Sequence, residues 1–149
     1  METTIHKNKY IRLSDKKREL IFDLIAFAFI ILFTYTAGSK LMIVKDFSNV
    51  LSMSPLIGDY SKFISYAIPI VEIVISILLI IQSTKRVGLL LSLALMLVFT
   101  IYLIYMISLG GKLPCHCGGV ITKLTWNQHI IFNSFFIVLA LFGLIIHKK

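Results

Sequence analysis

Charged residues are scarce in this sequence, and acidic residues are the scarcest. Among its 149 residues 15% are charged, and only seven are aspartate or glutamate, against 15 lysines and arginines. The sequence has no phosphate-binding loop and no serine-hydrolase motif, so nothing in it supports those two classes of enzyme. Most of it is apolar: 58% of the residues are hydrophobic and the mean hydropathy is +0.91, far above a soluble globular composition. We therefore expect an integral membrane protein.

The excess of positive charge, a net +8, does not indicate nucleic-acid binding. The basic residues fall in clusters between apolar segments and do not alternate with aromatic residues along one stripe. Such clusters are typical of the segments that orient a membrane protein. The partner that they predict is the lipid bilayer, and we expect no nucleic acid.

Four apolar stretches are long enough to cross a bilayer, which takes about 20 residues. We expect spans over about residues 20–41, 63–82, 87–109 and 126–146, with a basic tail over 1–19 and a short tail over 147–149. The fold class is then all-α, a four-transmembrane-helix bundle. A tight turn joins the second and third spans, so these two should be antiparallel neighbours.

The pattern between residues 42 and 62 is weaker and amphipathic. Phe47, Val50 and Leu51 recur at helical spacing, and the chain then meets Pro55. This predicts a short interfacial helix after the first span, or alternatively an extension of that span bent at the interface.

The lysines and arginines are distributed unequally between the two sides of these spans. Ten fall on the side of the termini and five on the other, so the positive-inside rule predicts cytoplasmic termini. In a bacterium this is a multi-pass inner-membrane protein with the loop between the last two spans in the periplasm, where disulfides persist. The small-residue pattern at residues 35–37 leaves cleavage of the first span as an alternative to an uncleaved first helix.

Both cysteines of the sequence, Cys115 and Cys117, lie on that loop, one residue apart. Pro114 and the Gly118-Gly119 pair beside them favour a turn. A disulfide between them would close a very small ring, and a strained disulfide is easily reduced. A structural crosslink would gain little from so short a loop. His116 adds positive charge that favours the thiolate form, so thiol–disulfide exchange is the chemistry that this spacing favours.

Two other uses of the cysteines remain open at this stage. The pair can be structural, holding a fixed turn. It can also bind a metal together with His116 and His129, although zinc sites usually separate paired cysteines by two to four residues. A thiolate pair suits monovalent copper better, but we expect no metal.

Glu72 is the residue of the spans that most needs an explanation, because it lies about nine residues into the second one. A carboxylate at that depth costs several kcal/mol unless it is paired or hydrated. We expect Lys40, near the outer end of the first span, to be its partner. The structural alternative is an ion pair or a hydrogen bond to Tyr102, Thr100 or Asn133 that holds the bundle in register; the functional one is a proton or quinone role.

Several short segments in this order resemble the DoxX-like membrane proteins, and within them the redox-associated MauE-type branch. The resemblance covers about residues 20–146. The matching segments are Ala37-Gly38-Ser39-Lys40-Leu41, Phe47, Ser54-Pro55-Leu56, Ile68-Pro69-Ile70-Val71-Glu72, Tyr102, Cys115-His116-Cys117-Gly118-Gly119, Trp126 and Asn133.

The resemblance implies a four-helix membrane bundle that handles thiols or disulfides, often alongside a thioredoxin-like partner. MauE is associated with maturation of a disulfide-rich methylamine dehydrogenase subunit. The chain departs from that branch at Gly118-Gly119, where an aromatic residue commonly precedes the glycine, so the redox role is better supported than that partner.

We therefore expect a membrane thiol–disulfide oxidoreductase or redox-maturation factor. Cys115 and Cys117 would exchange electrons with an extracytoplasmic thioredoxin-like or disulfide-containing protein, and His116, Glu72, Lys40 and Asn133 would support them. A single cysteine pair can react repeatedly only if a membrane quinone or a second protein returns it to its starting oxidation state. The alternative is a non-catalytic integral subunit, or scaffold, of a larger membrane complex.

Overall fold

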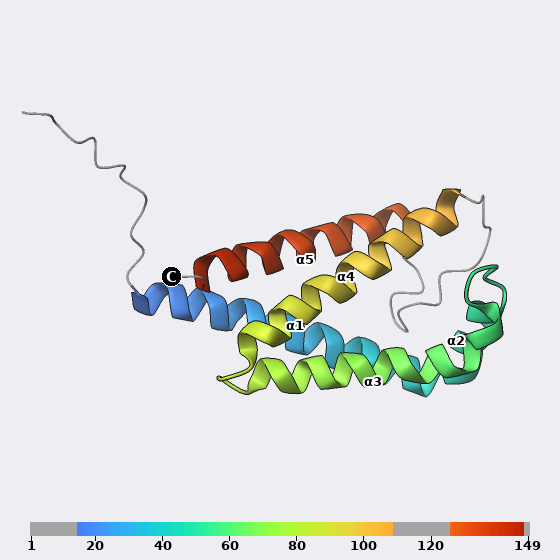
Figure 1. Ribbon diagram of the computed structural model, residues 1–149, viewed down its shortest axis with the longest axis horizontal. Helices are drawn as coiled ribbons and strands as arrows, with labels where there is room; N and C mark the ends of the chain where they lie inside the picture. Colours follow the sequence, from blue (N-terminus) through green and yellow to red (C-terminus); the bar gives the residue numbers. More distant parts are fainter. Residues whose placement is uncertain (1–14, 109–125, 148–149) are drawn as a thin grey trace, which may run out of the picture.

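The computed structural model of the chain describes residues 15–108 and 126–147, and within these residues it is all-helical, with no strand. Four of the helices are long and apolar enough to cross a membrane, which confirms the predicted fold class. The elements in chain order are α1 (Asp15–Met42), α2 (Val44–Ser52), the 3-10 helix η1 (Gly58–Tyr60), α3 (Ser61–Ile80), α4 (Lys85–Ser108) and α5 (Trp126–His147) (Figure 1).

The four long helices alternate in direction around the bundle. α1 packs against α3 and α5, and α4 packs against the same two helices from the other side. We call the end of the bundle where α1 begins, α3 connects to α4 and α5 ends the terminal end (Figure 1). We call the opposite end, where α2 lies, α4 ends and α5 begins, the α2 end. The short turn between α3 and α4 makes them antiparallel neighbours, as the sequence predicted.

Polar contacts join the long helices at the terminal end. Arg18 Nη2 donates a hydrogen bond to the carbonyl of Ile146 at 2.7 Å, which ties the start of α1 to the end of α5. Lys85 Nζ lies 2.7 Å from Asp23 Oδ1 and so joins α4 to α1.

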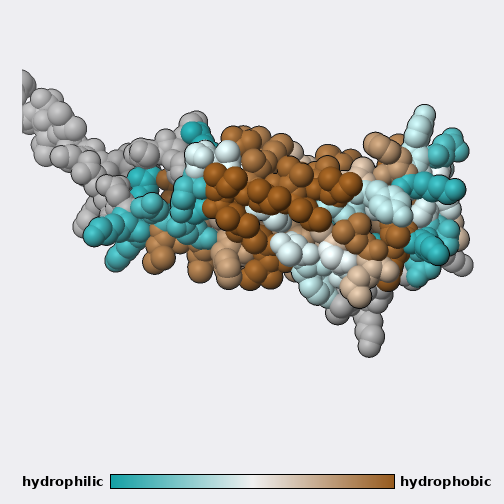
Figure 2. All heavy atoms as spheres, turned by 90° about the horizontal axis from the view of Figure 1, so that it is seen from below, coloured by the Kyte–Doolittle hydropathy of each residue, from teal (hydrophilic) through white to brown (hydrophobic). Residues whose placement is uncertain are grey.

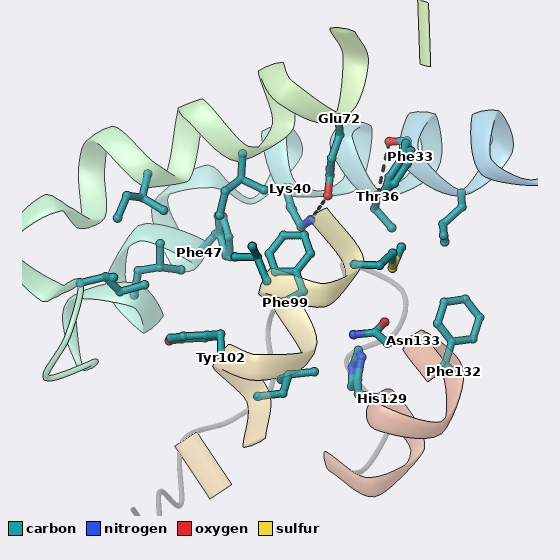
Figure 3. A pocket seen from close by; sticks show the side chains of 18 residues that line it. Phe33, Thr36, Lys40, Phe47, Glu72, Phe99, Tyr102, His129, Phe132 and Asn133 are labelled. Atoms are coloured by element: carbon teal, nitrogen blue, oxygen red, sulfur yellow. Dashed lines mark hydrogen bonds and ion pairs between the residues drawn. The ribbon is translucent and has the colours of Figure 1, made fainter. Parts of the chain in front are cut away.

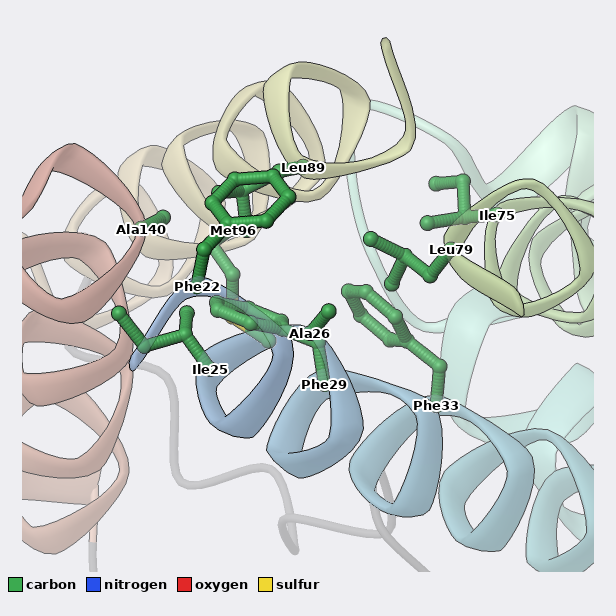
Figure 4. Packing of buried hydrophobic residues seen from close by; sticks show 10 residues of the cluster. All are labelled: Phe22, Ile25, Ala26, Phe29, Phe33, Ile75, Leu79, Leu89, Met96 and Ala140. Atoms are coloured by element: carbon green, nitrogen blue, oxygen red, sulfur yellow. The ribbon is translucent and has the colours of Figure 1, made fainter. Parts of the chain in front are cut away.

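The apolar core fills the half of the bundle nearer the terminal end. Figure 4 shows its residues directed inward from all four long helices, with most of the large side chains supplied by α1. Phe29 lies edge-on to Phe136 of α5, with ring centroids 5.2 Å apart. The cluster comprises Phe22, Ile25, Ala26, Phe29, Phe33, Ile75, Leu79, Leu89, Met96 and Ala140. Side chains from all four long helices therefore form the core of this half of the bundle.

The outside of the bundle carries a broad apolar band. Figure 2 shows hydrophobic side chains over the middle of one face, with hydrophilic ones gathered at both ends. Large apolar side chains such as Leu24, Phe27 and Ile31 of α1 are exposed, which a soluble protein would avoid and a bilayer would cover.

The predicted amphipathic helix is present as α2. Its apolar side buries Phe47 and Leu51, while Lys45 and Asp46 are exposed. Ile43, with φ −113° and ψ 30°, is the single residue between α1 and α2, so α2 is a separate helix that follows the first span almost without a loop.

The helix α1 extends beyond the predicted first span. It begins at Asp15 instead of about residue 20, because the polar run over 15–19 can continue the helix into water and an apolar pattern marks only the part within the bilayer. The other three spans differ from their predicted bounds by one or two residues, the scatter usual at helix ends.

Gly58 is expected to be intolerant of any side chain. A Cβ on this residue would lie 2.7 Å from the carbonyl oxygen of Ser52, and a backbone atom cannot swing away. Gly58→Ala should therefore displace η1 from α2 and destabilise the protein by about 1–3 kcal/mol. The measurement is the thermal unfolding midpoint of the purified protein in detergent.

Gly38 provides the matched control, because a Cβ there meets nothing within 4 Å. Gly38→Ala should leave the midpoint unchanged or raise it, since alanine favours helix over glycine by about 1 kcal/mol. Equal midpoints for the two alanine variants would mean that the α2–η1 contact is not tight.

Candidate functional site

A cavity of about 250 Å³ lies between the helices in the half of the bundle nearer the α2 end. We call it the bundle pocket. Every helix from α1 to α5 contributes to its wall, which is mostly apolar with a few polar groups (Figure 3). The lining residues are Leu32, Phe33, Thr36, Lys40, Phe47, Leu51, Ile57, Ile64, Ile68, Glu72, Met96, Val98, Phe99, Tyr102, Leu103, His129, Phe132 and Asn133.

An ion pair between Lys40 and Glu72 forms one side of the pocket. Lys40 Nζ donates a hydrogen bond to Glu72 Oε1, and both residues are buried, at 4% and 1% exposed. The same ammonium group lies 5.0 Å from the centroid of the Phe99 ring, within the range of a cation–π contact. The structure thus confirms the predicted partner of Glu72.

The second carboxylate oxygen, Glu72 Oε2, is also buried but accepts no hydrogen bond from the described residues. The Thr36 hydroxyl lines the pocket within reach of the Glu72 carboxylate, and it also donates to the carbonyl of Phe33 at 3.3 Å. Buried polar atoms nearly always have a hydrogen-bond partner. An unpaired acceptor on a cavity wall is therefore a position where a ligand or a water molecule can donate a hydrogen bond.

The wall opposite the ion pair is polar as well and comes from α5. Figure 3 shows His129 and Asn133 directed into the pocket from this helix, with Phe99 between the two polar sides and Tyr102 to one side of them. His129 and Asn133 are each only 8% exposed. The Asn133 amide makes no hydrogen bond to another described residue, although it is more than nine-tenths buried.

The structure brings together three of the predicted site residues, Lys40, Glu72 and Asn133, around one cavity. Of the alternative partners for Glu72, Tyr102 lines the same cavity, whereas the Thr100 hydroxyl donates to the carbonyl of Met96 at 2.8 Å within its own helix.

The cysteine segment falls outside the described residues, and with it Cys115, His116 and Cys117. What the structure does give is the position of its two ends, Ser108 and Trp126, at the α2 end of the bundle. The segment is therefore anchored at the end toward which the bundle pocket lies. Among residues 15–108 and 126–147, no group of three histidine, cysteine or acidic side chains could hold a metal ion.

Thr36 and Phe99 are among the pocket residues that sequence reasoning did not single out. Thr36 could have been found, because it stands four residues before Lys40 and therefore on the same face of α1. Phe99 gave no such signal, since it is one apolar residue among many in its span.

Comparison with known proteins assigns the chain to a family. The family model described as methylamine utilisation protein MauE matches residues 18–146, nearly the whole chain. The chain belongs to the MauE family. This MauE-family protein, with its four apolar helices, is a multi-pass membrane protein. The match supports the MauE part of the resemblance and does not extend to the wider DoxX-like group. No curated protein and no solved structure gives a significant match.

Proposed function

We propose that this MauE-family protein is a membrane thiol–disulfide oxidoreductase or redox-maturation factor. It would exchange electrons with an extracytoplasmic, thioredoxin-like or disulfide-containing protein through Cys115 and Cys117. The observation that carries the proposal is the pair itself: two cysteines one residue apart, in the segment that joins α4 to α5. Membership of a family described by methylamine utilisation is consistent with a maturation role of this kind.

The exchange itself conserves atoms and electrons. A thiolate of the partner attacks one sulfur of a Cys115–Cys117 disulfide, the other cysteine leaves as a thiolate, and a mixed disulfide forms. The partner's second thiolate then releases the oxidised partner, and both cysteines of this protein are left reduced. With the opposite starting states, the same steps reduce the partner.

The distribution of basic residues over the two ends of the bundle supports an extracytoplasmic encounter. Among the described residues, the start of α1 and the end of α5 lie at one end of the bundle, and the cysteine segment joins α4 to α5 at the other end. The terminal end carries most of the basic residues, such as Lys16, Lys17 and Arg86, which the positive-inside rule assigns to the cytoplasm. The cysteine segment would then face the periplasm of a bacterium, where disulfides are stable.

The experiment that tests this proposal is thiol labelling in intact cells with a membrane-impermeant alkylating reagent. We expect labelling of Cys115 and Cys117 only after reduction, seen as a mass shift of two reagent molecules. That result would mean an outward-facing disulfide.

Two outcomes would contradict it. Cells that stay unlabelled before and after reduction, but label once opened, would place the cysteines in the cytoplasm and invert the orientation. Two cysteines that never form a disulfide in cells, even during turnover of a candidate partner, would remove the exchange chemistry.

A further inference from the structure

We propose that the bundle pocket binds the head group of a membrane quinone, a neutral planar ring with an oxygen at each of two opposite edges. Binding of the ring depends only on the pocket. The use of the ring as an electron acceptor or donor rests on the proposed function.

The hydrogen-bonding groups of the pocket are arranged on two facing sides. Lys40 Nζ keeps further N–H groups after its bond to Glu72 Oε1, and the Asn133 amide on the opposite side has its donors unused by any other described residue (Figure 3). A carbonyl oxygen at each edge of one ring would accept a hydrogen bond from each side. A ligand with a single polar end would leave one of the two sides unsatisfied.

The orphaned oxygen Glu72 Oε2 suits the reduced form of the same ligand. A quinone carbonyl can only accept a hydrogen bond, whereas a hydroquinone hydroxyl can also donate one. Lys40 supplies a donor and Glu72 Oε2 supplies an acceptor at the same place on the wall. The quinone would use the Lys40 donor alone, whereas the hydroquinone would use both groups, so this side of the pocket can bind either form and satisfies both of its polar atoms with the reduced one.

The charge of the pocket favours a neutral ligand. The ammonium of Lys40 is already neutralised by the carboxylate of Glu72, and both are buried. A phosphate or a fatty-acid carboxylate would add an uncompensated negative charge in a medium of low dielectric constant, which is costly. A quinone carries no charge in either of its stable forms.

The remaining walls suit an aromatic ring that arrives from the bilayer. Phe99, Tyr102 and Phe132 offer ring faces and edges for stacking. Val98 lines the pocket and is at the same time 62% exposed on α4, so the pocket reaches the lipid-facing surface. A volume of about 250 Å³ takes a substituted ring, and its isoprenoid chain would stay in the lipid.

If the cysteine pair works as proposed, a quinone in the bundle pocket could reoxidise it after each exchange. Oxidation of the dithiol of Cys115 and Cys117 to a disulfide releases two electrons and two protons, and a quinone takes up both to become a hydroquinone. No other co-reactant is needed.

The test is photolabelling of the purified protein in lipid nanodiscs with an azido-quinone, followed by peptide mapping. We expect label on segments of α1, α4 and α5 that line the pocket, and loss of label when decylubiquinone competes. Asn133→Leu removes one hydrogen-bonding side at similar volume and should weaken competition about tenfold. Ile68→Phe, which fills the cavity from α3, should weaken labelling by a different route.

Asn127→Leu is the matched control, because Asn127 is exposed on the same helix and does not line the pocket. It should label as the unchanged protein does. Label that spreads over the lipid-facing surface, resists competition, or is equal in Asn133→Leu and Asn127→Leu would overturn the proposal. So would a phospholipid or fatty acid that copurifies in the pocket and blocks labelling.

Different results would contradict the proposed function and the proposed quinone site. Replacing both cysteines by serine should leave the photolabelling intact, because the hydrogen-bonding groups proposed to hold the ring belong to Lys40, Glu72 and Asn133. Uncompeted labelling together with cysteine-dependent exchange would reject the quinone site alone; specific labelling with no cysteine-dependent exchange would reject the proposed function alone.

Discussion

Replacing either Cys115 or Cys117 by serine is expected to abolish exchange with a dithiol partner. A single thiolate can still attack a disulfide and form a mixed disulfide, but without the second cysteine there is no internal group to resolve it. The measurement is the rate at which the purified protein, supplied with a quinone, oxidises the dithiol of a reduced thioredoxin. We expect the rate of each variant to fall to the uncatalysed background, because a lone cysteine cannot form the internal disulfide that the thioredoxin dithiol must attack.

The double-serine variant separates catalysis from assembly. If both single variants keep full activity, the oxidoreductase proposal is wrong. If a partner instead copurifies with the double-serine protein in fixed stoichiometry and its function in cells is unchanged, the protein is a non-catalytic subunit of a larger membrane complex. In that case the cysteines are a structural feature of the segment between α4 and α5.

Much of the fold could be predicted from the sequence because a bilayer permits so few solutions. A spanning segment must satisfy its backbone hydrogen bonds internally, so each long apolar run becomes one helix of predictable length. The start of α1 at Asp15 was not predicted, because the apolar pattern marks only the part of a helix that lies within the bilayer. Outside the bilayer the pattern ends while the helix continues. α2 was predictable because a helix with Phe47 and Leu51 on one side and charges on the other has a clear amphipathic period.

The candidate site could be predicted only in part. Lys40 and Glu72 were linked because charges are so costly in a membrane interior that each one needs a partner. Thr36 could have been placed from its spacing to Lys40, but Phe99 and the position of His129 could not. Helices that are apolar on every side carry no stripe that tells which face turns inward. Their rotation follows from packing across the whole bundle, and so does the cavity that they leave.

The Lys40–Glu72 pair offers the second large effect, a loss of stability when one partner is removed. Lys40→Met keeps the length of the side chain but leaves the Glu72 carboxylate buried at 1% exposure without its cation. Breaking a buried pair in this way typically costs about 3–5 kcal/mol. We therefore expect Lys40→Met to unfold at a much lower detergent or denaturant concentration than the unchanged protein, measured by loss of helical circular dichroism.

Lys85→Met is the matched control, because it breaks the other described ion pair of the bundle. The Asp23 side chain of that pair is 41% exposed, so water can take over the role of the lysine, and the expected loss is under about 1 kcal/mol. Equal losses in Lys40→Met and Lys85→Met would mean that the pocket pair is solvated and not buried.

The double variant Lys40→Met with Glu72→Leu then distinguishes structure from function. Removing both charges and filling the space with apolar groups is often neutral or stabilising, so this protein should recover most of the stability that Lys40→Met loses. A stable double variant with full activity would assign the pair to packing alone. A stable double variant that no longer binds the quinone would show that two charges are kept in the membrane interior for the ligand they hold, and that the fold could stand without them.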